Sequence, residues 1–448
     1  MFQAKDWRVV PAIISTAILS FSGVLIETSM NVTFPKLMTE FQVDATSIQW
    51  VTTGNLLAVA VIVPLSAYLI KNYSERNIFI AANILFLLGM AIDSLAPNLP
   101  ILLIGRVLQG MGTGIALPLL FHIIMQEVPI ERRGLIMGIA TMTTSLAPAI
   151  GPTYGGFVLA LLGWKMIFVL LFPILIVSTI IGLRSIPKKE VLVLDSLNFA
   201  AFISLGVALS CLLLAIEKLS ILLLVLAILA FILFYQVNKR LPLLKLSVFK
   251  NKAFMILLLG VLAYQMLPLA LSFILPNHLQ IVLHQSSIKA GLFMFPGAIL
   301  AAFLYPFSGH LLDKIGAFKP ILSGMSCAIL GLFLMTLALM KDSLLFLLMS
   351  DILVKLGMGI GASNMITMAL TKLRQSESAD GNSLLNTLQQ FSGAFATAVA
   401  SQFFAMGKNS GLANGLSLGA RNGTYFILLL LVLSLGGIIY LRVKKELT

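Results

Sequence analysis

Cysteine, histidine and charged side chains are all scarce in this sequence. It contains 2 Cys and 4 His among 448 residues, and only 10% of its residues are Asp, Glu, Lys or Arg. Both cysteines lie in apolar stretches, which favours free, packed thiols over a disulfide. Because the cysteines and histidines also lack the spacing of metal ligands, we expect no metal site.

Sequence signatures of enzymatic chemistry are missing as well. No Gly-x-x-x-x-Gly-Lys-Ser/Thr phosphate loop is present, so nucleotide hydrolysis has no site. No Ser/His/Asp, Cys/His or paired-carboxylate set falls in a polar segment, and no polar segment is long enough to form a soluble domain. We therefore expect neither an enzyme nor a cofactor, and an ion gradient remains as the energy source.

Long apolar runs fill the chain instead. Hydrophobic residues make up 59% of the sequence, and a helix needs about 20 mostly apolar residues to cross the hydrocarbon core. Fourteen spans can be placed, at residues 11–36, 47–70, 77–96, 99–124, 134–161, 164–185, 197–216, 219–237, 253–276, 288–311, 318–340, 344–370, 382–406 and 423–441. The sequence therefore predicts an all-α integral membrane protein with fourteen transmembrane helices. The segment from Gly407 to Gly423, rich in Gly, Asn and Ser, predicts a connector between the last two spans.

The distribution of positive charge predicts the partner and the orientation of these spans. A net charge of +13 would suit nucleic acid, but the Lys and Arg residues fall mainly in short loops between apolar runs. They are about three times as frequent in the alternate segments that include both termini as in the others. This bias predicts a lipid bilayer as the partner, rather than nucleic acid, with both termini in the cytoplasm.

The chain also repeats itself. Pro64 and Ser66 recur as Pro306 and Ser308 at one constant offset. The repeat predicts two six-helix, pseudo-symmetric halves around a central cavity, which is a known plan of membrane transporters. We expect three units: an N-terminal six-helix bundle over residues 1–190, an extra two-helix hairpin over 191–240 and a C-terminal six-helix bundle over 241–448.

The first apolar span carries a carboxylate. Glu27 lies within it, and Ser20, Gly23 and Asn31 share its helix face at spacings of three or four residues. A carboxylate inside a membrane helix costs about 2.5–3.5 kcal/mol on insertion scales, so it normally faces a cavity or a partner. We predict that Glu27 and Asn31 belong to a proton-coupling and substrate-binding site.

Other charges within the spans offer partners. Arg106 is a fixed cation in the fourth span, where it needs an ion pair or backbone carbonyls around it. Asp351 and Lys355 lie four residues apart on one helix face, where they either neutralise each other or contact cargo. Asp93 lies near the end of the third span, and a solvated helix end accounts for it.

Two sets of residues resemble the signature of a transporter family. One set lies in the fourth span: Arg106, Gln109, Gly110, Gly112 and Gly114. The other lies in the fifth span: Pro148, Gly151, Pro152, Gly155 and Gly156. In order and spacing they resemble the Arg-x-x-Gln-Gly-x-Gly and Gly-Pro-x-x-x-Gly-Gly motifs of the major facilitator superfamily, the second set being one residue tighter here. The acidic-x-x-x-Asn-x-x-x-Pro pattern of the first span is similar to that of its fourteen-helix drug:proton antiporters, the QacA-, NorB- and SdrM-like multidrug efflux pumps.

The resemblance, which covers essentially the whole chain, implies roles for these residues. Arg106 and Gln109 would take part in proton coupling, with Arg106 responding when Glu27 gains or loses a proton. The proline and glycine set of the fifth span would seal the path across the membrane. On physical grounds alone, its GxxxG pair, Gly151 and Gly155, predicts close packing against another helix.

One loop departs from the family pattern. Family members usually carry a Gly-x-x-x-Asp-x-x-Gly-Arg sequence between spans two and three that locks the cytoplasmic side, and Lys71 stands here in place of the acid. The second-half copy retains Gly309, Asp313 and Gly316. We expect the gating loop to depend chiefly on Asp313, unless Lys71 acts in a different way.

Together these features predict a proton-coupled multidrug efflux antiporter in the bacterial cytoplasmic membrane. A proton and a cargo that both need Glu27 cannot occupy it together, so cargo leaves as a proton enters. We expect a monomer that exports amphipathic cationic or zwitterionic drugs, such as dyes, fluoroquinolones and quaternary ammonium compounds, by alternating access. Two alternatives remain: proton-coupled export of a single endogenous metabolite or lipid, and a non-transporting membrane sensor.

Overall fold

The computed structural model describes residues 8–188, 196–316, 318–341, 343–374 and 377–444. Within these ranges, the side chains of residues 67, 130–135, 137–138, 141–145, 306, 309–313, 315 and 378–380 lie outside the description. All regular structure in the described ranges is helical. The predicted all-α class is therefore confirmed.

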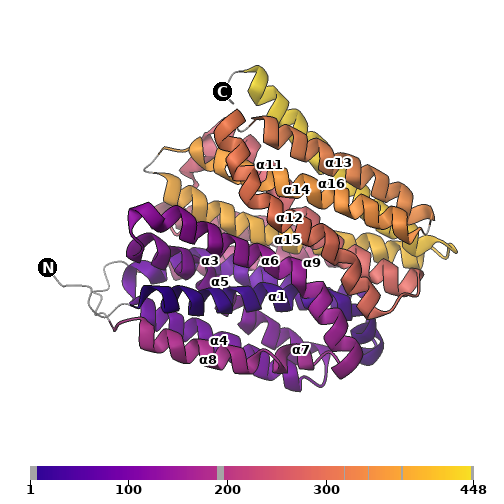
Figure 1. Cartoon of the computed structure of the whole chain (residues 1–448), viewed down its shortest axis with the longest axis horizontal. Coiled ribbons are helices and arrows are strands. Elements are labelled where there is room, and N and C mark those ends of the chain that lie inside the picture. The colour runs from indigo at the N-terminus through magenta and orange to yellow at the C-terminus, as the bar shows by residue number, and fades with distance from the viewer. Residues whose placement is uncertain (1–7, 189–195, 317, 342, 375–376, 445–448) are drawn as a thin grey trace.

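Long helices joined by short connections make up the chain (Figure 1). The first half contains α1 (Val9–Phe41), α2 (Ala45–Ile48), α3 (Trp50–Asn72), α4 (Glu75–Leu95), α5 (Leu99–Glu127), α6 (Ile130–Leu162), α7 (Met166–Val169) and α8 (Phe172–Ser185). Next come α9 (Phe199–Lys218) and α10 (Ile221–Arg240). The second half contains η1 (Leu246–Lys250), α11 (Lys252–Asn277), η2 (His278–Val282), α12 (Ser287–Ile315), α13 (Phe318–Lys341), α14 (Leu344–Thr371), α15 (Ser378–Asn409) and α16 (Gly415–Val443).

The predicted spans fall on these helices, two of them on the broken pairs α2–α3 and α7–α8. Counted over the described residues, twelve helical stretches are long and apolar enough to cross a membrane. In α6 the side chains are described without a break from Leu146 to Leu162, and this part is apolar. The more polar α15 packs against α3, α9, α11 and α16. Because protein surrounds it on several sides, it does not need the apolar surface of a lipid-facing helix.

The two halves pack their helices in the same pattern. In the first half α1 contacts α5, α6 and α8, and in the second α11 contacts α14, α15 and α16. Likewise α5 lies against α3 and α4, as α14 lies against α12 and α13. The halves meet where α6 packs on α12 and α3 packs on α15. This arrangement confirms two pseudo-symmetric halves, while the residue limits of the three predicted units stay predictions.

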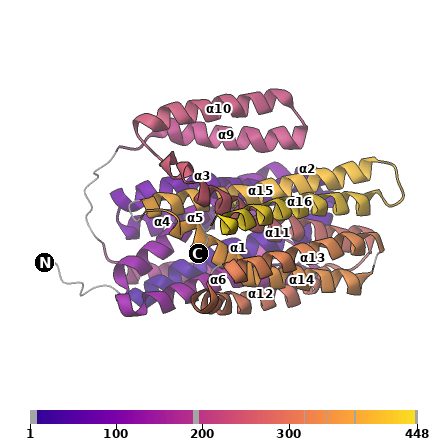
Figure 2. The ribbon, with the colours of Figure 1, turned by 90° about the horizontal axis from the view of Figure 1, so that it is seen from above.

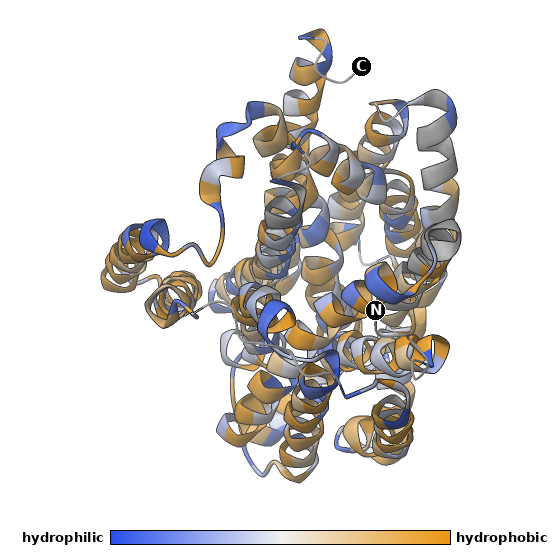
Figure 3. Cartoon of the chain, turned by 90° about the vertical axis from the view of Figure 1, so that its left-hand side faces the viewer, coloured by the Kyte–Doolittle hydropathy of each residue, from blue (hydrophilic) through white to orange (hydrophobic). Residues whose placement is uncertain are grey.

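The bundle has two ends, which we name by the residues found there. Because successive long helices run in opposite directions, α1 ends, α3 begins and α5 begins at the same end, the Trp50 end. The opposite end, where α1 begins, is the Val9 end. Figure 3 shows that most of the ribbon is hydrophobic. Large apolar side chains also cover the outer surface, as Leu222, Leu229 and Leu233 do on α10. So much exposed apolar area suits lipid rather than water.

The segment from Gly407 to Gly423 is more ordered than its composition predicts. Helix α15 continues to Asn409 and α16 begins at Gly415, so helix covers most of the predicted connector. A Cβ atom at Gly407 would collide with the backbone oxygen of Gly415. Glycine at these positions therefore serves the close approach of two helix ends, and the connector between α15 and α16 is shorter than the predicted segment.

The extra hairpin, α9–α10, lies at one side of the bundle (Figure 2). Its contacts with both halves run through α9, which packs on α3 and α15. At the end of α9 the indole Nε1 of Trp50 donates a hydrogen bond to the carboxylate of Glu217. The side-chain Nε2 of Gln402 donates to the backbone carbonyl of Glu217. One residue of the hairpin therefore binds α3 of the first half and α15 of the second.

Substitution of the Glu217 side chain should affect the hydrogen bond from Trp50 and leave the bond from Gln402 to the Glu217 backbone in place. We expect Glu217→Ala to lower the free energy of unfolding by about 1–3 kcal/mol, because the Trp50 indole loses its charged acceptor. In Glu217→Gln the amide oxygen still accepts from Trp50, so a smaller loss is expected. Thermal unfolding in detergent, with Lys218→Ala as the neighbouring exposed control, measures the difference. Equal melting temperatures for the Ala, Gln and wild-type proteins would contradict this role.

Candidate functional site

Glu27 lies at mid-length in α1, where nearly all neighbouring positions are buried. Its side chain is only 6% exposed, because α1 is covered by α5, α6, α8 and α11. Arg106 of α5 interacts electrostatically with it. The structure therefore places the predicted acid and the predicted cation in one buried region, although their roles in transport stay predictions.

Arg106 is the centre of a hydrogen-bonded cluster and is fully buried. Its Nε donates to the backbone oxygen of Val51 at 2.9 Å, and its Nη1 donates to Oε1 of Gln109 at 2.5 Å. The Nε2 of Gln109 then donates to Oδ2 of Asp93 at 2.7 Å. The backbone oxygen of Arg106 also accepts from Asn55 at 2.8 Å. The cluster thus joins α3, α4 and α5 around one guanidinium.

Asp93 is the residue that the sequence interpretation missed. A solvated helix end was expected, but the Asp93 side chain is 0% exposed and bonded to Gln109, so that interpretation was wrong. The physical reason is the close packing of α4 on α5. A Cβ atom at Gly105 would collide with Oδ1 of Asp93, and one at Gly89 would lie 2.5 Å from the Gly105 oxygen. The glycine directly before Arg106 was the available sequence signal, since it marks a close approach by another helix.

Asn31 lies one helical turn beyond Glu27, toward the Trp50 end. It is 1% exposed, and its Oδ1 accepts a hydrogen bond of 2.8 Å from Oγ1 of Thr52 on α3. Val51, which binds Arg106, is the residue next to Thr52. The start of α3 therefore contacts both the Asn31 face of α1 and the Arg106 cluster.

The proline and glycine set of α6 lies between α1 and α12. On one side, a Cβ atom at Gly155 would lie 2.5 Å from the backbone oxygen of Ser29. The Ser29 hydroxyl donates to the Gly151 oxygen at 2.8 Å. On the other side, a Cβ atom at Gly156 would lie 2.5 Å from the backbone oxygen of Ser287. Close packing of this set is confirmed. It connects the helix of Glu27 with the opposite half, whereas a sealing function stays a prediction.

Pro148 and Pro152 both lie inside the continuous helix α6. The backbones of α6 and α12 come close together at Pro152. A Cβ atom at Gly291 of α12 would collide with the backbone oxygen of Pro152. Oγ1 of Thr153, the next residue, donates to the Gly291 oxygen at 3.2 Å. Pro152 therefore belongs to a seam between the two halves.

Asp351 and Lys355 form a separate buried group in the second half. Both lie on α14, with exposures of 0% and 5%, and they interact electrostatically. Neither carboxylate oxygen of Asp351 has a hydrogen-bond partner among the described residues. A Cβ atom at Gly297 of α12 would lie 3.0 Å from Oδ2 of Asp351. A structural role and a cargo contact both stay predictions for this pair.

The predicted gating residues lie toward the Val9 end. Lys71 is exposed in the last turn of α3. Gly316 follows α12 with a φ of +75°, a left-handed conformation that favours glycine. Gly309 and Asp313 fall on α12, but their side chains lie outside the described part of the chain. A gating role for these four residues stays a prediction.

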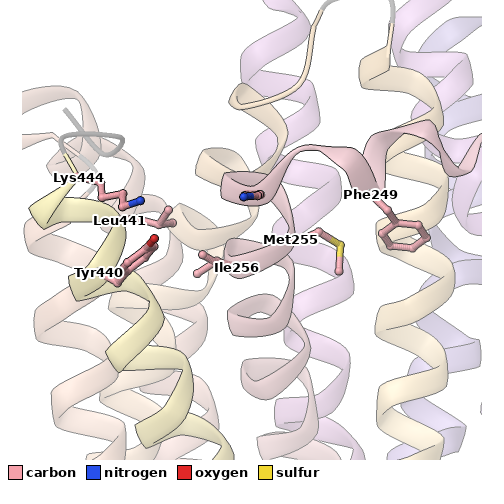
Figure 4. Close-up of a pocket in the computed structure, with 7 residues that line it drawn as sticks. Phe249, Met255, Ile256, Tyr440, Leu441 and Lys444 are labelled. Carbon is pink, nitrogen blue, oxygen red and sulfur yellow. The ribbon is translucent and has the colours of Figure 1, made fainter.

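Two surface grooves lie apart from the Arg106 cluster. One, of about 310 Å³, opens between η1, α11 and the end of α16. Figure 4 shows Tyr440 of α16 and Lys444, the residue that follows α16, pointing toward Ile256 of α11 across it. The other, of about 480 Å³, is lined by Lys36 and Trp164 among others. Neither groove is lined by Glu27, so neither belongs to the predicted coupling site.

Comparison with known proteins places this geometry in a family. Residues 16–397 match the Major Facilitator Superfamily. The chain is 32% identical over 417 residues to the lincomycin resistance protein LmrB of Listeria monocytogenes, covering 90% of this chain and 88% of that protein. It is 30% identical over 399 residues to the riboflavin transporter RibZ of Clostridioides difficile, covering 86% of each.

A solved structure has the same fold at low sequence identity. A POT family transporter, crystallised in complex with 5-aminolevulinic acid, superimposes with a TM-score of 0.72 at 15% identity, covering 96% of this chain and 95% of that one. The family match extends over most of the chain, and the helices of both halves form the fold that it implies. This chain is therefore a multi-pass membrane transporter, not an enzyme, and it belongs to the Major Facilitator Superfamily.

Proposed function

We propose that this transporter is a proton-coupled multidrug exporter of the bacterial cytoplasmic membrane. The observation that carries the proposal is the buried Glu27, held within the electrostatic reach of the fully buried Arg106. Family membership supports it, as does similarity to a protein named for lincomycin resistance. The cargo would be amphipathic cationic or zwitterionic drugs, and the protein would work as a monomer.

The mechanism follows from competition for one carboxylate. Glu27 lies in a low-dielectric region, where an uncompensated charge is costly. Either a proton or a positively charged cargo relieves that cost, and the two exclude each other. The excess of Lys and Arg at the Val9 end supports a cytoplasmic position for that end. A proton entering from the Trp50 end then gains about 2.3 kcal/mol per 100 mV of membrane potential. A monovalent cationic cargo leaving toward that end loses the same amount, so the pH gradient drives their exchange, whereas the potential adds to the drive for a zwitterionic cargo.

Alternating access requires the two halves to rock about the substrate. The α6–α12 and α3–α15 contacts are the surfaces that would rearrange. The small residues of α6, which lie against both α1 and α12, place this seam next to the helix of Glu27. Proton binding at Glu27 would therefore act directly on the helix packing that separates the two membrane faces.

Transport in inside-out vesicles energised by a pH gradient tests the proposal. The wild-type protein should accumulate a cationic dye or a fluoroquinolone. We expect Glu27→Gln to bind the dye but to lose at least about tenfold in gradient-driven transport, because its amide cannot take up the proton. Glu40→Gln, near the end of the same helix, is the matched control and should transport normally. Normal transport by Glu27→Gln would refute the assignment, and Asp351→Asn would be tested next.

Export of one endogenous metabolite is the second candidate. The similarity to a protein named as a riboflavin transporter favours it. The same buried acid would serve that reaction, but specificity would be narrow. Gradient-driven flux of riboflavin, with no flux of dyes or fluoroquinolones in the same vesicles, would support this alternative over multidrug export.

A further inference from the structure

Arg106 faces two buried carboxylates rather than one. Glu27 approaches it from α1 and Asp93 from α4, and both acids interact electrostatically with the guanidinium. Asp93 and Arg106 are each 0% exposed, and Glu27 is 6% exposed. The mechanism described above uses Glu27 and Arg106 but leaves Asp93 without a role.

The amide of Gln109 fixes how Asp93 is held. Every N–H of an arginine side chain is a donor, so the atom of Gln109 that faces Arg106 must be its oxygen. The Nε2 group then faces Asp93, whose Oδ2 accepts from it at 2.7 Å. Gln109 therefore connects the carboxylate to the guanidinium in one defined orientation.

The backbone around Asp93 leaves room for its carboxylate. A Cβ atom at Gly105 would overlap Oδ1 of Asp93, so only glycine leaves this space to the acid. In the described part of the chain, Oδ1 of Asp93 and Nη2 of Arg106 are buried without a hydrogen-bond partner. One open acceptor and one open donor thus remain within the same cluster.

Among the described residues, the other charged groups on α4 and on the adjoining helices lie away from Asp93. Helix α4 packs on α3, α5, α7 and α8. Helix α7 has no charged residue, and Lys165 directly before it lies over the Trp164 ring. The others lie toward the Val9 end: Lys71 in the last turn of α3, Arg184 in the last turn of α8, Glu127 at the end of α5, Glu75 and Arg76 at the start of α4, and His122 beside Glu75. Arg106 is the cation that α5 places near Asp93, with Glu27 beyond it.

The net charge of Glu27, Asp93 and Arg106 together assigns a function to Asp93. With both acids ionised and Arg106 cationic, the buried cluster carries one net negative charge. A proton on Glu27, or one positive charge of a cargo beside it, brings the sum to zero. Without Asp93, Glu27 and Arg106 would already be neutral together, and a proton on Glu27 would leave a buried positive charge, which is costly.

We propose that Asp93 is the second counter-ion of Arg106, and that it sets the site to exchange one proton for one monovalent cationic drug. Asp93 is a positioning residue in this scheme, because it acts through Gln109 and Arg106 and not on the cargo. The inference depends on the proposed function, and it narrows the proposed cargo to monovalent cations. It also gives a physical reason for a buried acid at this place in α4.

Drug-induced proton release from purified full-length protein tests the inference. Ethidium, a monocation, is added over a range of pH, and released protons are followed with a pH indicator dye. The wild-type protein should release about one proton per ethidium bound. In Asp93→Asn the amide oxygen still accepts from Gln109, but one negative charge is lost. The pH at half-maximal release should then fall by about one unit or more. The positive charge of Arg106, no longer offset by Asp93, would favour the ionised form of Glu27, which would therefore release its proton at lower pH.

A second variant moves Asp93 without removing its charge. Gly105→Ala places a methyl group where Oδ1 lies and should shift the pH of half-maximal release in the same direction. Ser94→Ala is the control on α4, because the Ser94 hydroxyl donates to the Ala91 oxygen of its own helix and to no other group in the described part of the chain; it should cause no shift.

The possible outcomes separate this inference from the proposed function. If Asp93→Asn and Gly105→Ala keep the wild-type pH profile while Glu27→Gln abolishes release, Asp93 is not a counter-ion and the proton-coupled function stands. If ethidium binding to the wild-type protein releases no proton at any pH, proton coupling itself is refuted. A downward shift in both variants, with none in Ser94→Ala, supports the inference.

Discussion

Replacing Arg106 with methionine should lower the free energy of unfolding by about 3–5 kcal/mol and abolish proton-driven transport. Methionine fills much of the same space, but it removes the counter-charge of two buried carboxylates, Glu27 and Asp93. It also leaves the Val51 oxygen and the Gln109 amide without their donor. Unpaired buried groups of this kind account for the largest losses that single substitutions cause.

Arg106→Lys distinguishes charge from geometry. Lysine keeps the positive charge, but a single ammonium group cannot reproduce the planar fork that binds Val51 and Gln109 together. We expect a smaller loss of stability than in Arg106→Met, with transport still reduced at least about tenfold. Thermal unfolding in detergent and vesicle transport measure the two effects. Arg184→Met, which removes an exposed arginine, is the control. Wild-type stability in Arg106→Met would show that the cluster does not hold α3, α4 and α5 together.

Gly155→Val should disrupt the seam between α1 and α6. The new Cβ atom would lie 2.5 Å from the Ser29 oxygen and 2.9 Å from its Cα, which are backbone atoms that no rotamer change can move aside. The two helices would have to separate, so we expect a loss of about 3 kcal/mol in stability. Transport should also be lost, because the same seam adjoins the helix of Glu27.

Gly436→Val is the matched control for this substitution. A Cβ atom at Gly436 on α16 would meet no atom within 4 Å, so the same chemical change should be tolerated there. Expression, melting temperature and dye transport are compared for the two variants. If Gly155→Val behaves like Gly436→Val, close packing at position 155 is not required, and the importance given to this set of residues is wrong.

Local sequence patterns were sufficient for much of the fold. Apolar runs of about 20 residues predict membrane helices because a lipid environment requires every backbone polar group to bond within its own segment. The recurrence of Pro64 and Ser66 as Pro306 and Ser308 predicted the two halves, and the matching helix contacts confirm them. Gly151 and Gly155 predicted a close contact, which Ser29 supplies.

Patterns that depend on a distant partner were not readable in the same way. The segment from Gly407 to Gly423 predicted a connector, yet Gly407 and Gly415 allow two helix ends to pack together. The docking of α9 through Glu217 needs Trp50 and Gln402, which lie 167 and 185 residues away. No periodicity within one segment can indicate such partners.

The sequence by itself determined the membrane helices, the two repeated halves and the identity of the charged residues that lipid would exclude. A single ionisable residue in an apolar run is visible without any structure because its burial is costly wherever it lies. Only the tertiary structure decided which charges share a site. Near the end of a helix, Asp93 could face water or protein, and the close approach of α4 and α5 at Gly89 and Gly105 turned it toward Gln109 and Arg106.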